Sequence, residues 1–364
     1  MPVTLYTLVG LKIYLQENGP PINNMDAQAI LLISNQHPND GYLYAGEWLM
    51  PAFKKSLAIL GLSAISMSCF AVSTQCTSKE FTLQLLGSGG PISDDMRASS
   101  GELIWWKGKP RVLIDAGGGT FLRFGQAGAH LEDVDFIGIS HFHTDHSADL
   151  PAILKNSVFF SQEKDIDIAG PNGSDDFPSL TQFMHRMFAP GTGAFSYLAG
   201  MFDGSDGVNI KVHLTNVDYH LTTPTQVFDK DGLKVSAIGI PHGNVPNLAY
   251  RVDTADGSIV ISADQNGSNP AFINFAKGAD ILLLPAAITE DADAVSKFLH
   301  GTPSAMAKLA KASAPKMVVL NHFMGKSLVE KDQTLAIFKQ YYNGPVYAGR
   351  DLSCFPVVAP TQGE

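Results

Sequence analysis

The chain is poor in cysteine and in positive charge, and these shortages exclude several classes of protein. It has 3 Cys in 364 residues, and none stands at zinc-finger spacing. Its 25 Lys and Arg stand against 35 Asp and Glu, a formal net charge of -10. Proteins that follow a nucleic-acid backbone need clustered Lys and Arg, so we expect no nucleic acid as a partner. The sequence has no repeat period, low-complexity tract or heptad run, which excludes a solenoid or a coiled coil.

A stretch without charge lies near the start of the chain. From Met50 the sequence has two lysines, an apolar run that begins at Leu57, and then Ala71-Val72-Ser73, the order found in secretory signal peptides. We therefore expect residues 50–73 to be a signal peptide and residues 1–49 to be a wrongly assigned extension. The alternative is an internal apolar helix or a membrane span, since the run is long enough to cross a bilayer. Its Ser and Gly content argues against a stable span.

The expected location is therefore the periplasm or the medium. Two cysteines remain after the expected signal, Cys76 and Cys354, and they could pair. Alternatively, Cys76 could carry a lipid as the first residue of the mature protein. The preceding Ser73-Thr74-Gln75 is a poor lipoprotein box, so we expect secretion rather than anchoring.

Residues 80–360 have the pattern of one α/β domain. A short apolar run at 81–90 ends in glycines, and apolar segments at 102–106 and 111–115 flank a Gly-Lys-Pro turn. Segments typical of strands and of helices then alternate, which predicts layered sheets covered by helices. Residues 160–227 mix Phe, Met and Tyr with Gly and Asp. We expect a cap-like insertion there, whose apolar side chains line a pocket mouth or fill the core.

Three histidines and an aspartate crowd into six positions of the segment ISHFHTDHSADLP. Residues two apart in an extended or turning backbone face the same way, so His141 and His143 can hold one cation. Asp145 and His146 lie past the turn and can hold a second cation. The spacing therefore predicts a metal site.

Three further donors stand at the ends of expected strands. His242 follows SAIGIP, Asp264 follows IVISA and His322 follows MVVLN. Catalytic groups collect at such strand ends, because the loops there converge over one crevice. A lone histidine at a strand end is more often structural, but four donors cannot complete two coordination spheres. We therefore expect these three residues to complete two adjacent sites, with Asp264 bridging two cations that share a hydroxide and steady the leaving oxygen.

This order of donors resembles the metallo-β-lactamase superfamily of binuclear hydrolases, from about Phe81 to Cys354. The resemblance implies an α/β fold, a four-layer αββα sandwich with the metal centre between its halves. It assigns His141, His143 and His242 to one metal, Asp145, His146 and His322 to the other, and Asp264 to both. The donor set accepts zinc, manganese or iron, and we expect two divalent ions, zinc first.

Three other residues have a role implied by the resemblance. Asp115, in LIDAGGG, resembles the family's aspartate that braces the ligand loop, although an Asx turn explains it equally. His300 opens HGTPSAMAKLAKASAPKMVVLNHF, which resembles the helix of the ribonuclease Z branch that begins with a catalytic histidine. It is the expected proton donor to the leaving group, and an ordinary exposed histidine is the alternative. Arg97 could contact an anionic group or brace its own loop.

Within the superfamily, LLGSGGPISDDMRASS and PHGNVPNLAYRV resemble the ribonuclease Z branch. That branch has a glutamate that orients the catalytic histidine, but the corresponding LLPAAI has no acid here, and no basic arm for tRNA is evident. The phrases LGSGGP, RASS and SADLPA resemble the exported arylsulfatases of the same fold. We therefore expect hydrolysis of a small anionic ester, a sulfate ester first, with Asp145 orienting the nucleophile. The alternatives are phosphodiester hydrolysis, then lactone or acyl hydrolysis, then iron-dependent oxidation.

Overall fold

The computed structural model describes residues 4–8, 11–15, 76, 81–205 and 207–357. The chain divides into two compact units, Met1–Cys69 and Phe70–Glu364. In the first unit, β1 (Thr4–Leu8) and β2 (Leu11–Leu15) pair antiparallel. The expected signal peptide and most of the expected extension lie outside the described residues. Within the described part of the chain, no helix combines the length and the hydropathy needed to span a bilayer.

The first sheet of the second unit has seven strands in the order β16-β3-β4-β5-β6-β7-β8. Its strands are β3 (Thr82–Gly87), β4 (Gly101–Trp106), β5 (Lys109–Ile114), β6 (Phe136–Gly138), β7 (Lys164–Pro171), β8 (Ile210–Val217) and β16 (Cys354–Pro356). Pairing is antiparallel from β16 to β5 and parallel from β5 to β8. Parallel neighbours need crossover connections, which is where the helices of this half lie.

The second sheet repeats this plan in the order β15-β14-β13-β12-β11-β10-β9. Its strands are β9 (Thr225–Lys230), β10 (Leu233–Gly239), β11 (Leu248–Thr254), β12 (Gly257–Ile261), β13 (Ile281–Pro285), β14 (Met317–Asn321) and β15 (Val346–Ala348). Pairing is antiparallel from β9 to β12 and parallel from β12 to β15.

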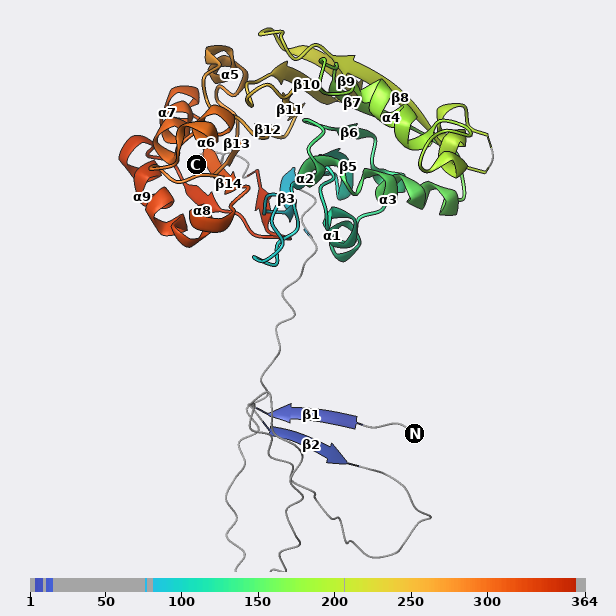
Figure 1. The fold of residues 1–364 in the computed structure, drawn as a ribbon, viewed down its shortest axis with the longest axis horizontal. Helices are drawn as coiled ribbons and strands as arrows, with labels where there is room; N and C mark the ends of the chain where they lie inside the picture. Colours follow the sequence, from blue (N-terminus) through green and yellow to red (C-terminus); the bar gives the residue numbers. More distant parts are fainter. Residues whose placement is uncertain (1–3, 9–10, 16–75, 77–80, 206, 358–364) are drawn as a thin grey trace, which may run out of the picture. The chain divides into compact units, whose positions relative to one another are not determined.

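Helices cover the outer face of each sheet (Figure 1). The helices are α1 (Thr120–Gln126), α2 (Thr144–Ser147), α3 (Leu150–Lys155), α4 (Leu180–Phe188), α5 (Pro270–Phe275), α6 (Ala294–Leu299), α7 (Pro303–Ser313), α8 (Gly325–Val329) and α9 (Lys331–Tyr341). Short 3-10 turns are η1 (Leu131–Asp133), η2 (Asn156–Phe159) and η3 (Ser196–Phe202). One apolar cluster joins α1, α3 and α4 to the first sheet, and another joins α5, α7 and α9 to the second.

A third apolar cluster fills the space between the two sheets. Successive strand residues point to opposite faces, so on β4 Leu103 packs under the helices while Ile104 packs toward the other sheet. From the second sheet, Tyr250 on β11 and Ile259 on β12 enter the same inner cluster. Each buried side chain of this size stabilises the fold by about 2 kcal/mol. The expected four-layer αββα sandwich is confirmed.

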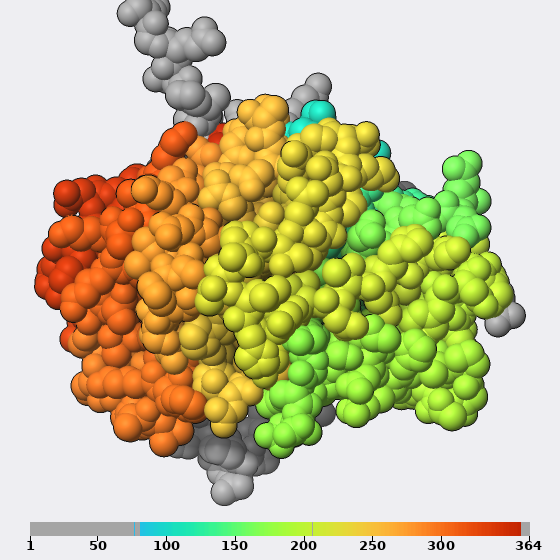
Figure 2. Space-filling view, turned by 90° about the horizontal axis from the view of Figure 1, so that it is seen from above, coloured from blue at the N-terminus to red at the C-terminus, as the bar shows by residue number. Residues whose placement is uncertain are grey.

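The expected insertion at residues 160–227 is partly sheet and core. It contributes β7 and β8, and α4 buries Leu180, Met184 and Phe188 in the cluster of the first sheet. In the space-filling view its residues, green to yellow, lie beside the orange residues of the later chain (Figure 2). The apolar residues of α4 therefore serve packing, and a role of this segment in substrate choice stays a prediction.

A disulfide joins the two ends of the second unit. Cys76 and Cys354 are bonded, with their Cα atoms 5.8 Å apart, and Cys354 opens the edge strand β16. Of the two alternatives for Cys76, the structure therefore shows pairing, which leaves its sulfur no place for a lipid.

Candidate metal centre

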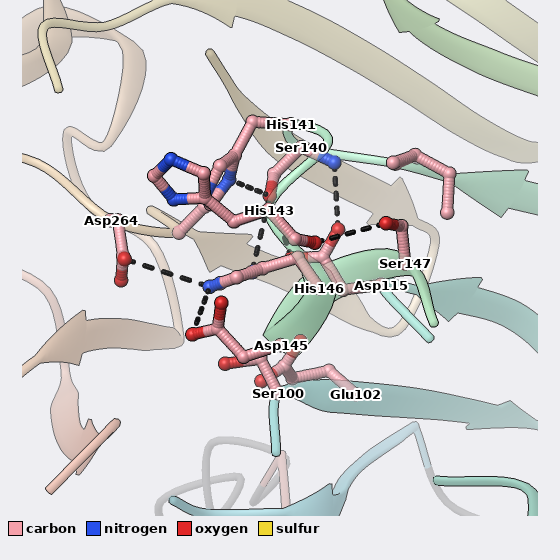
Figure 3. A network of polar contacts seen from close by, with 12 residues as sticks. Ser100, Glu102, Asp115, Ser140, His141, His143, Asp145, His146, Ser147 and Asp264 are labelled. Carbon is pink, nitrogen blue, oxygen red and sulfur yellow. Dashed lines mark hydrogen bonds and ion pairs between the residues drawn. The ribbon is translucent and has the colours of Figure 1, made fainter. Parts of the chain in front are cut away.

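The His-rich segment lies where β6 ends, facing the ends of three strands of the second sheet. His141 follows β6, His143 precedes α2, and Asp145 and His146 lie on α2. Figure 3 shows His141, His143 and His146 gathered above Asp145, with Asp264 facing them. In its four residues α2 has no side-chain cap, but His146 O accepts a hydrogen bond from Ala116 N at 2.8 Å. This bond ties the short helix to the loop after β5.

Three imidazoles form the first group of donors. His141 Nε2 lies 3.0 Å from His143 Nδ1, and the His242 ring lies 5.1 and 5.2 Å from the rings of these two residues. One nitrogen of each lies within 4.8 Å of the others, which suits three ligands of one ion. His242 comes from the loop after β10, more than 90 residues away in sequence.

Two carboxylates and two imidazoles form the second group of donors. His322 Nε2 lies 3.2 Å from Asp145 Oδ2 and 3.3 Å from Asp264 Oδ1. Asp264 Oδ2 lies 3.5 Å from His146 Nε2 and 3.7 Å from His242 Nε2. The Asp264 carboxylate therefore faces both groups. The structure brings together all seven residues that the sequence singled out.

Asp115 orients two of these histidines. Its Oδ2 accepts from His146 Nδ1 and from Ser140 Oγ, both at 2.7 Å, and its Oδ1 accepts from Ser140 N at 2.7 Å. Since a carboxylate only accepts, His146 Nδ1 carries a hydrogen, and Nε2 is the nitrogen that faces Asp145 and Asp264. Ser140 Oγ, having donated to Asp115, accepts from His141 Nδ1 at 2.9 Å. One buried carboxylate therefore sets the tautomer of both rings.

His242 is oriented by the backbone of α6. Its Nδ1 lies 2.8 Å from the carbonyl oxygen of Leu299, which can only accept. The ring therefore donates from Nδ1 and turns the lone pair of Nε2 toward Asp264. No sequence motif could have indicated this contact, because any residue at position 299 offers the same carbonyl.

Three residues at the strand ends have left-handed backbone. The φ angles are 57° at Asp115, 50° at Ala263 and 56° at His322. Such a conformation in a residue other than glycine costs of order 1 kcal/mol and persists only where the surroundings hold it. The sharp turns that it allows point Asp115, Asp264 and His322 back toward the same crevice.

The charges around Asp264 favour the binding of a cation. Burial alone raises the pKa of a carboxyl, but the imidazoles of His322, His300 and His146 hold the pKa of Asp264 well below its usual range. Burial lowers the pKa of His146, yet Asp115 and Asp264 bring it well above the usual value. Among the described residues, no Lys or Arg pairs with Asp145 or Asp264.

The donor set fits a divalent cation. Asp264 Oδ1 is buried and takes no hydrogen bond within the described part of the chain, and one nitrogen of each imidazole of the first group lies within 4.8 Å of the other two. Imidazole and carboxylate are the ligands of zinc and related ions. Burial and the neighbouring rings of His146 and His242 lower the pKa of His141 well below its usual value, so that ring is neutral and able to bind a metal.

Glu102 is a buried acid that the sequence gave no reason to single out. It lies on β4, directly under the centre, and its Oε1 accepts from Asn321 Nδ2 at 2.8 Å (Figure 3). Burial, followed by the Asp115 carboxylate, raises the pKa of Glu102 well above its usual value. Glu102 lies in an otherwise apolar strand and belongs to no motif, so its charge was the only sign in the sequence that it differs from its neighbours.

His300 lies at the edge of the centre, directly after α6. Its Nδ1 is 3.9 Å from Asp264 Oδ2, and its ring lies 4.9 Å from that of His242. Burial, outweighing the Asp264 carboxylate, lowers the pKa of His300 to about 4. Glu290, the nearest acid in sequence to the LLPAAI segment, binds Ser304 at the start of α7 instead. His300 is therefore buried rather than an exposed cap residue, and His242, Asp264 and His300 also form a group that could hold an ion.

Arg97 braces its own loop. Its guanidinium donates to Ser88 Oγ at 3.1 Å and to Gly349 O at 3.4 Å. Asp351 accepts from Ser88 and from Ala98 N in the same cluster. The structure thus shows the bracing contacts of Arg97, and contact with an anionic substrate stays a prediction.

The αββα sandwich and the cluster of donors at the carboxyl ends of its strands together define the class of this protein. It is a metal-dependent hydrolase of the metallo-β-lactamase fold. The model of the family described as the beta-lactamase superfamily domain matches residues 110–323, and the chain belongs to that superfamily.

Curated relatives of this chain are ribonucleases Z. The chain is 26% identical to "Ribonuclease Z" of Methanopyrus kandleri over 261 residues, 68% of this chain and 88% of that protein. It is 30% identical to "Ribonuclease Z" of Mycobacterium sp. (strain KMS) over 188 residues, 50% of this chain and 60% of that protein. The match thus spans less than two thirds of the mycobacterial protein.

Solved structures share the fold. Human tRNase Z, short form, superposes with a TM-score of 0.58 at 21% identity, covering 76% of this chain and 99% of that one. YhfI of Bacillus subtilis, a metallo-beta-lactamase fold protein, superposes with a TM-score of 0.57 at 19% identity and the same coverage.

These comparisons correct the expected function. The relatives are named as ribonucleases, and the bond that a ribonuclease cleaves is a phosphodiester. The expectation of a sulfate ester hydrolase is therefore wrong. The physical reason is that metal ligands alone do not distinguish a sulfate ester from a phosphate ester. None of the three segments that favoured sulfate esters contains one of the seven donors; SADLPA, for example, begins at the last residue of α2 and runs into α3.

Proposed function

We propose that this protein hydrolyses phosphodiesters with the help of two divalent cations. The observation that carries the proposal is the Asp264 carboxylate, which faces three imidazoles on one side and Asp145, His146 and His322 on the other. The names of the relatives supply the class of bond. The reaction adds water across one P–O bond, giving a phosphomonoester and a free alcohol.

In this proposal the ligands are shared as the sequence suggested. His141, His143 and His242 would hold the first ion, and Asp145, His146 and His322 would hold the second, with Asp264 facing both groups. We propose zinc, because the first group is all imidazole and the second combines imidazole with carboxylate. Such ions would lower the pKa of a bound water and neutralise charge on the leaving oxygen.

The chain's own residues prepare this chemistry. Asp115 and Leu299 O keep a hydrogen on Nδ1 of His146, His141 and His242, so that Nε2 of each ring is the nitrogen offered to an ion, which would displace any proton held there. Asp145 Oδ2 lies 3.2 Å from His322 Nε2, where it would orient the attacking water. Burial holds the pKa of His300 at about 4 in the free protein, so in this proposal the ring takes up a proton when the anionic phosphodiester binds beside it and then passes that proton to the departing oxygen.

We also propose that the chain acts outside the cytoplasm, from residue 74 onward as a single catalytic domain. The Cys76–Cys354 disulfide supports this, because such bonds persist in oxidising compartments and are rare where thiols are kept reduced. The signal-like composition of residues 50–73 supports it independently.

The test of the proposed function uses bis(p-nitrophenyl) phosphate. Protein stripped with a chelator and reloaded with zinc should bind about two equivalents of zinc and release p-nitrophenol. His143→Ala should lower kcat/KM at least about 100-fold. His213→Ala is the matched control, because His213 pairs with Asp165 on the surface of β8. Full activity in His143→Ala, or equal activity with and without metal, would refute the proposed function.

A further inference from the structure

A cleft of about 520 Å³ opens beside the candidate metal centre, and no step of the proposed reaction uses it. Its walls come from the loop after β3, the segment after β13, the first half of α6 and the start of α8. Figure 1 shows α6, β13 and α8 together in the orange part of the domain. This is the size of pocket that holds a small ligand or one part of a larger one.

The cleft adjoins the proposed ligand His322. Met324 lines it and follows His322 by two residues. Both side chains lie against Gly90, where a Cβ atom would stand 2.7 Å from His322 Cε1 and 3.0 Å from Met324 Sδ. His322 and Met324 therefore pack closely over Gly90, which puts the wall of the cleft next to the metal centre.

The cleft also adjoins His300 through α6. Ser296 lines the cleft, and its carbonyl oxygen accepts from His300 N at 2.8 Å. His300 therefore lies one helical turn from Ser296, a residue of the cleft wall.

The inner wall of the cleft is apolar. Ile92, Ala287, Ile288 and Met324 contribute to it, and Ala287 and Ile288 are buried. The three hydroxyls at the cleft already donate, from Thr289 to Asp291 at 2.7 Å, from Ser296 to Asp293 at 2.9 Å and from Ser327 to Met324 O at 3.1 Å. The wall therefore suits an arm with an apolar face and offers few polar partners.

The rim of the cleft is acidic. Lys326 lies 2.7 Å from Asp291 and 3.6 Å from Glu330, so its charge is already balanced. The Asp293 carboxylate accepts from Val295 N and Ser296 N at the start of α6. Two carboxylates and one paired ammonium leave a negative rim, which would repel the successive phosphates of a nucleic-acid strand.

We propose that this cleft binds the leaving arm of the substrate, and that this arm is compact, uncharged and apolar on one face. The substrate is then a small phosphodiester rather than a polynucleotide. This inference rests on the proposed function, since it names the substrate class of the same centre.

The test measures binding, so that it does not depend on turnover. Zinc-loaded protein is titrated by calorimetry with phenylphosphonate and with methylphosphonate, two anions with the same headgroup and different arms. We expect phenylphosphonate to bind at least about tenfold more tightly. A single-stranded ten-nucleotide RNA is the third titrant, and we expect its binding to be weaker than that of phenylphosphonate at physiological salt.

Two variants assign the preference to the cleft. Ala292→Trp fills it, and Ile92→Glu adds a carboxylate to its wall should the tryptophan disturb folding. Both should bring the ratio of phenylphosphonate to methylphosphonate affinity close to one. The matched control is Ala294→Trp, since Ala294 is an exposed residue two positions on that does not line the cleft. It should keep the wild-type ratio.

The outcomes separate this inference from the proposed function. Equal affinity for the two phosphonates in the wild type, or a ratio that survives both cleft variants, would overturn the cleft as an arm site even if phosphodiesters are hydrolysed. RNA that binds more tightly than phenylphosphonate would overturn the small-substrate inference. A clear preference that the cleft variants abolish, in a protein without phosphodiesterase activity, would support the cleft and refute the proposed function.

Discussion

Short chains of hydrogen bonds, or relays, run from the buried carboxylate of Asp115 to the histidines of the candidate centre. Asp115 reaches His146 directly and His141 through the hydroxyl of Ser140, in bonds of 2.7 to 2.9 Å. Each relay holds a hydrogen on Nδ1 and turns Nε2 toward the centre. Because the tautomers are set before any ion arrives, ion binding needs little rearrangement.

Asp115→Asn should weaken metal binding. An asparagine keeps one acceptor but turns a donor toward either Ser140 or His146, and it removes the charge that favours the orienting bonds. We expect zinc affinity to fall about 10- to 100-fold, measured by competition with a chromogenic chelator. Asp165→Asn is the matched control, because it alters a surface Asp–His pair on β7 and β8. Unchanged zinc affinity in Asp115→Asn would contradict the orienting role.

Glu102 should make the metal-free protein less stable as pH rises. Its pKa in the folded state is raised, so folding is unaffected below the unfolded value and loses free energy as pH climbs from there toward the folded pKa. The loss is about 1.4 kcal/mol per pH unit over that window. Glu102→Gln keeps an acceptor for Asn321 Nδ2 and does not titrate.

Urea unfolding in the presence of a chelator tests this prediction. The gain in stability of Glu102→Gln over the wild type should be larger at pH 8 than at pH 5. Glu163→Gln, an exposed change, is the control and should show no such trend. A gain that is the same at both pH values would show that Glu102 does not titrate as its burial indicates.

At the scale of elements, α6 links several parts of the centre although none of its residues is buried. Its last carbonyls accept from His242 Nδ1 and from Asn266 Nδ2, at 2.8 and 2.9 Å. The next residue is His300. The helix is held at its other end by Asp293, which caps it. The position of α6 therefore governs one proposed ligand and the proposed proton donor together.

Asp293→Ala should loosen α6 and weaken the centre without unfolding the domain. Loss of the cap frays the first turn, and the carbonyl that orients His242 then loses its fixed position. We expect zinc affinity to fall about tenfold, with faster amide exchange in residues 294–299. Asp203→Ala removes an aspartate that accepts from Ser205 N directly after η3, far from the proposed ligands in sequence, and should change neither quantity. Equal zinc affinity in Asp293→Ala and wild type would contradict the coupling.

At the scale of the whole domain, the disulfide closes the first sheet. Residues 76 and 354 are 278 positions apart, so the bond encloses nearly all of the described sandwich. It fastens β16, a strand of three residues at the sheet edge, beside β3. A cross-link over so long a loop stabilises mainly by limiting the unfolded chain.

Removing this bond should lower stability and leave the centre intact. The double variant Cys76→Ala, Cys354→Ala should lose about 2 to 4 kcal/mol of unfolding free energy, measured by urea titration. Reductant should lower the stability of the wild type by a similar amount and leave the variant unchanged. Zinc affinity should be equal in both proteins. A wild type indifferent to reductant would contradict a stabilising role.

The sequence by itself predicted layered sheets covered by helices and marked the seven donors, and the αββα arrangement followed from the resemblance that those donors carry. Apolar segments such as β10 and β12 mark strands because the pattern of a strand is local, and His141 to His146 are marked by their own spacing. His242, Asp264 and His322 were predictable because each directly follows an apolar strand. The residues within a few positions of each strand end therefore indicate which metal ligands that strand end can offer.

Only the tertiary structure decided how those donors are oriented and what lies beside them. Glu102 meets Asn321 across 219 positions, His242 meets a backbone carbonyl at residue 299, and Cys76 meets Cys354 at the far end of the domain. The cleft beside His322 is likewise built from four separate segments. Contacts between residues so far apart leave no period and no spacing in the chain, because they arise only when packed layers bring strand ends and loops into one place.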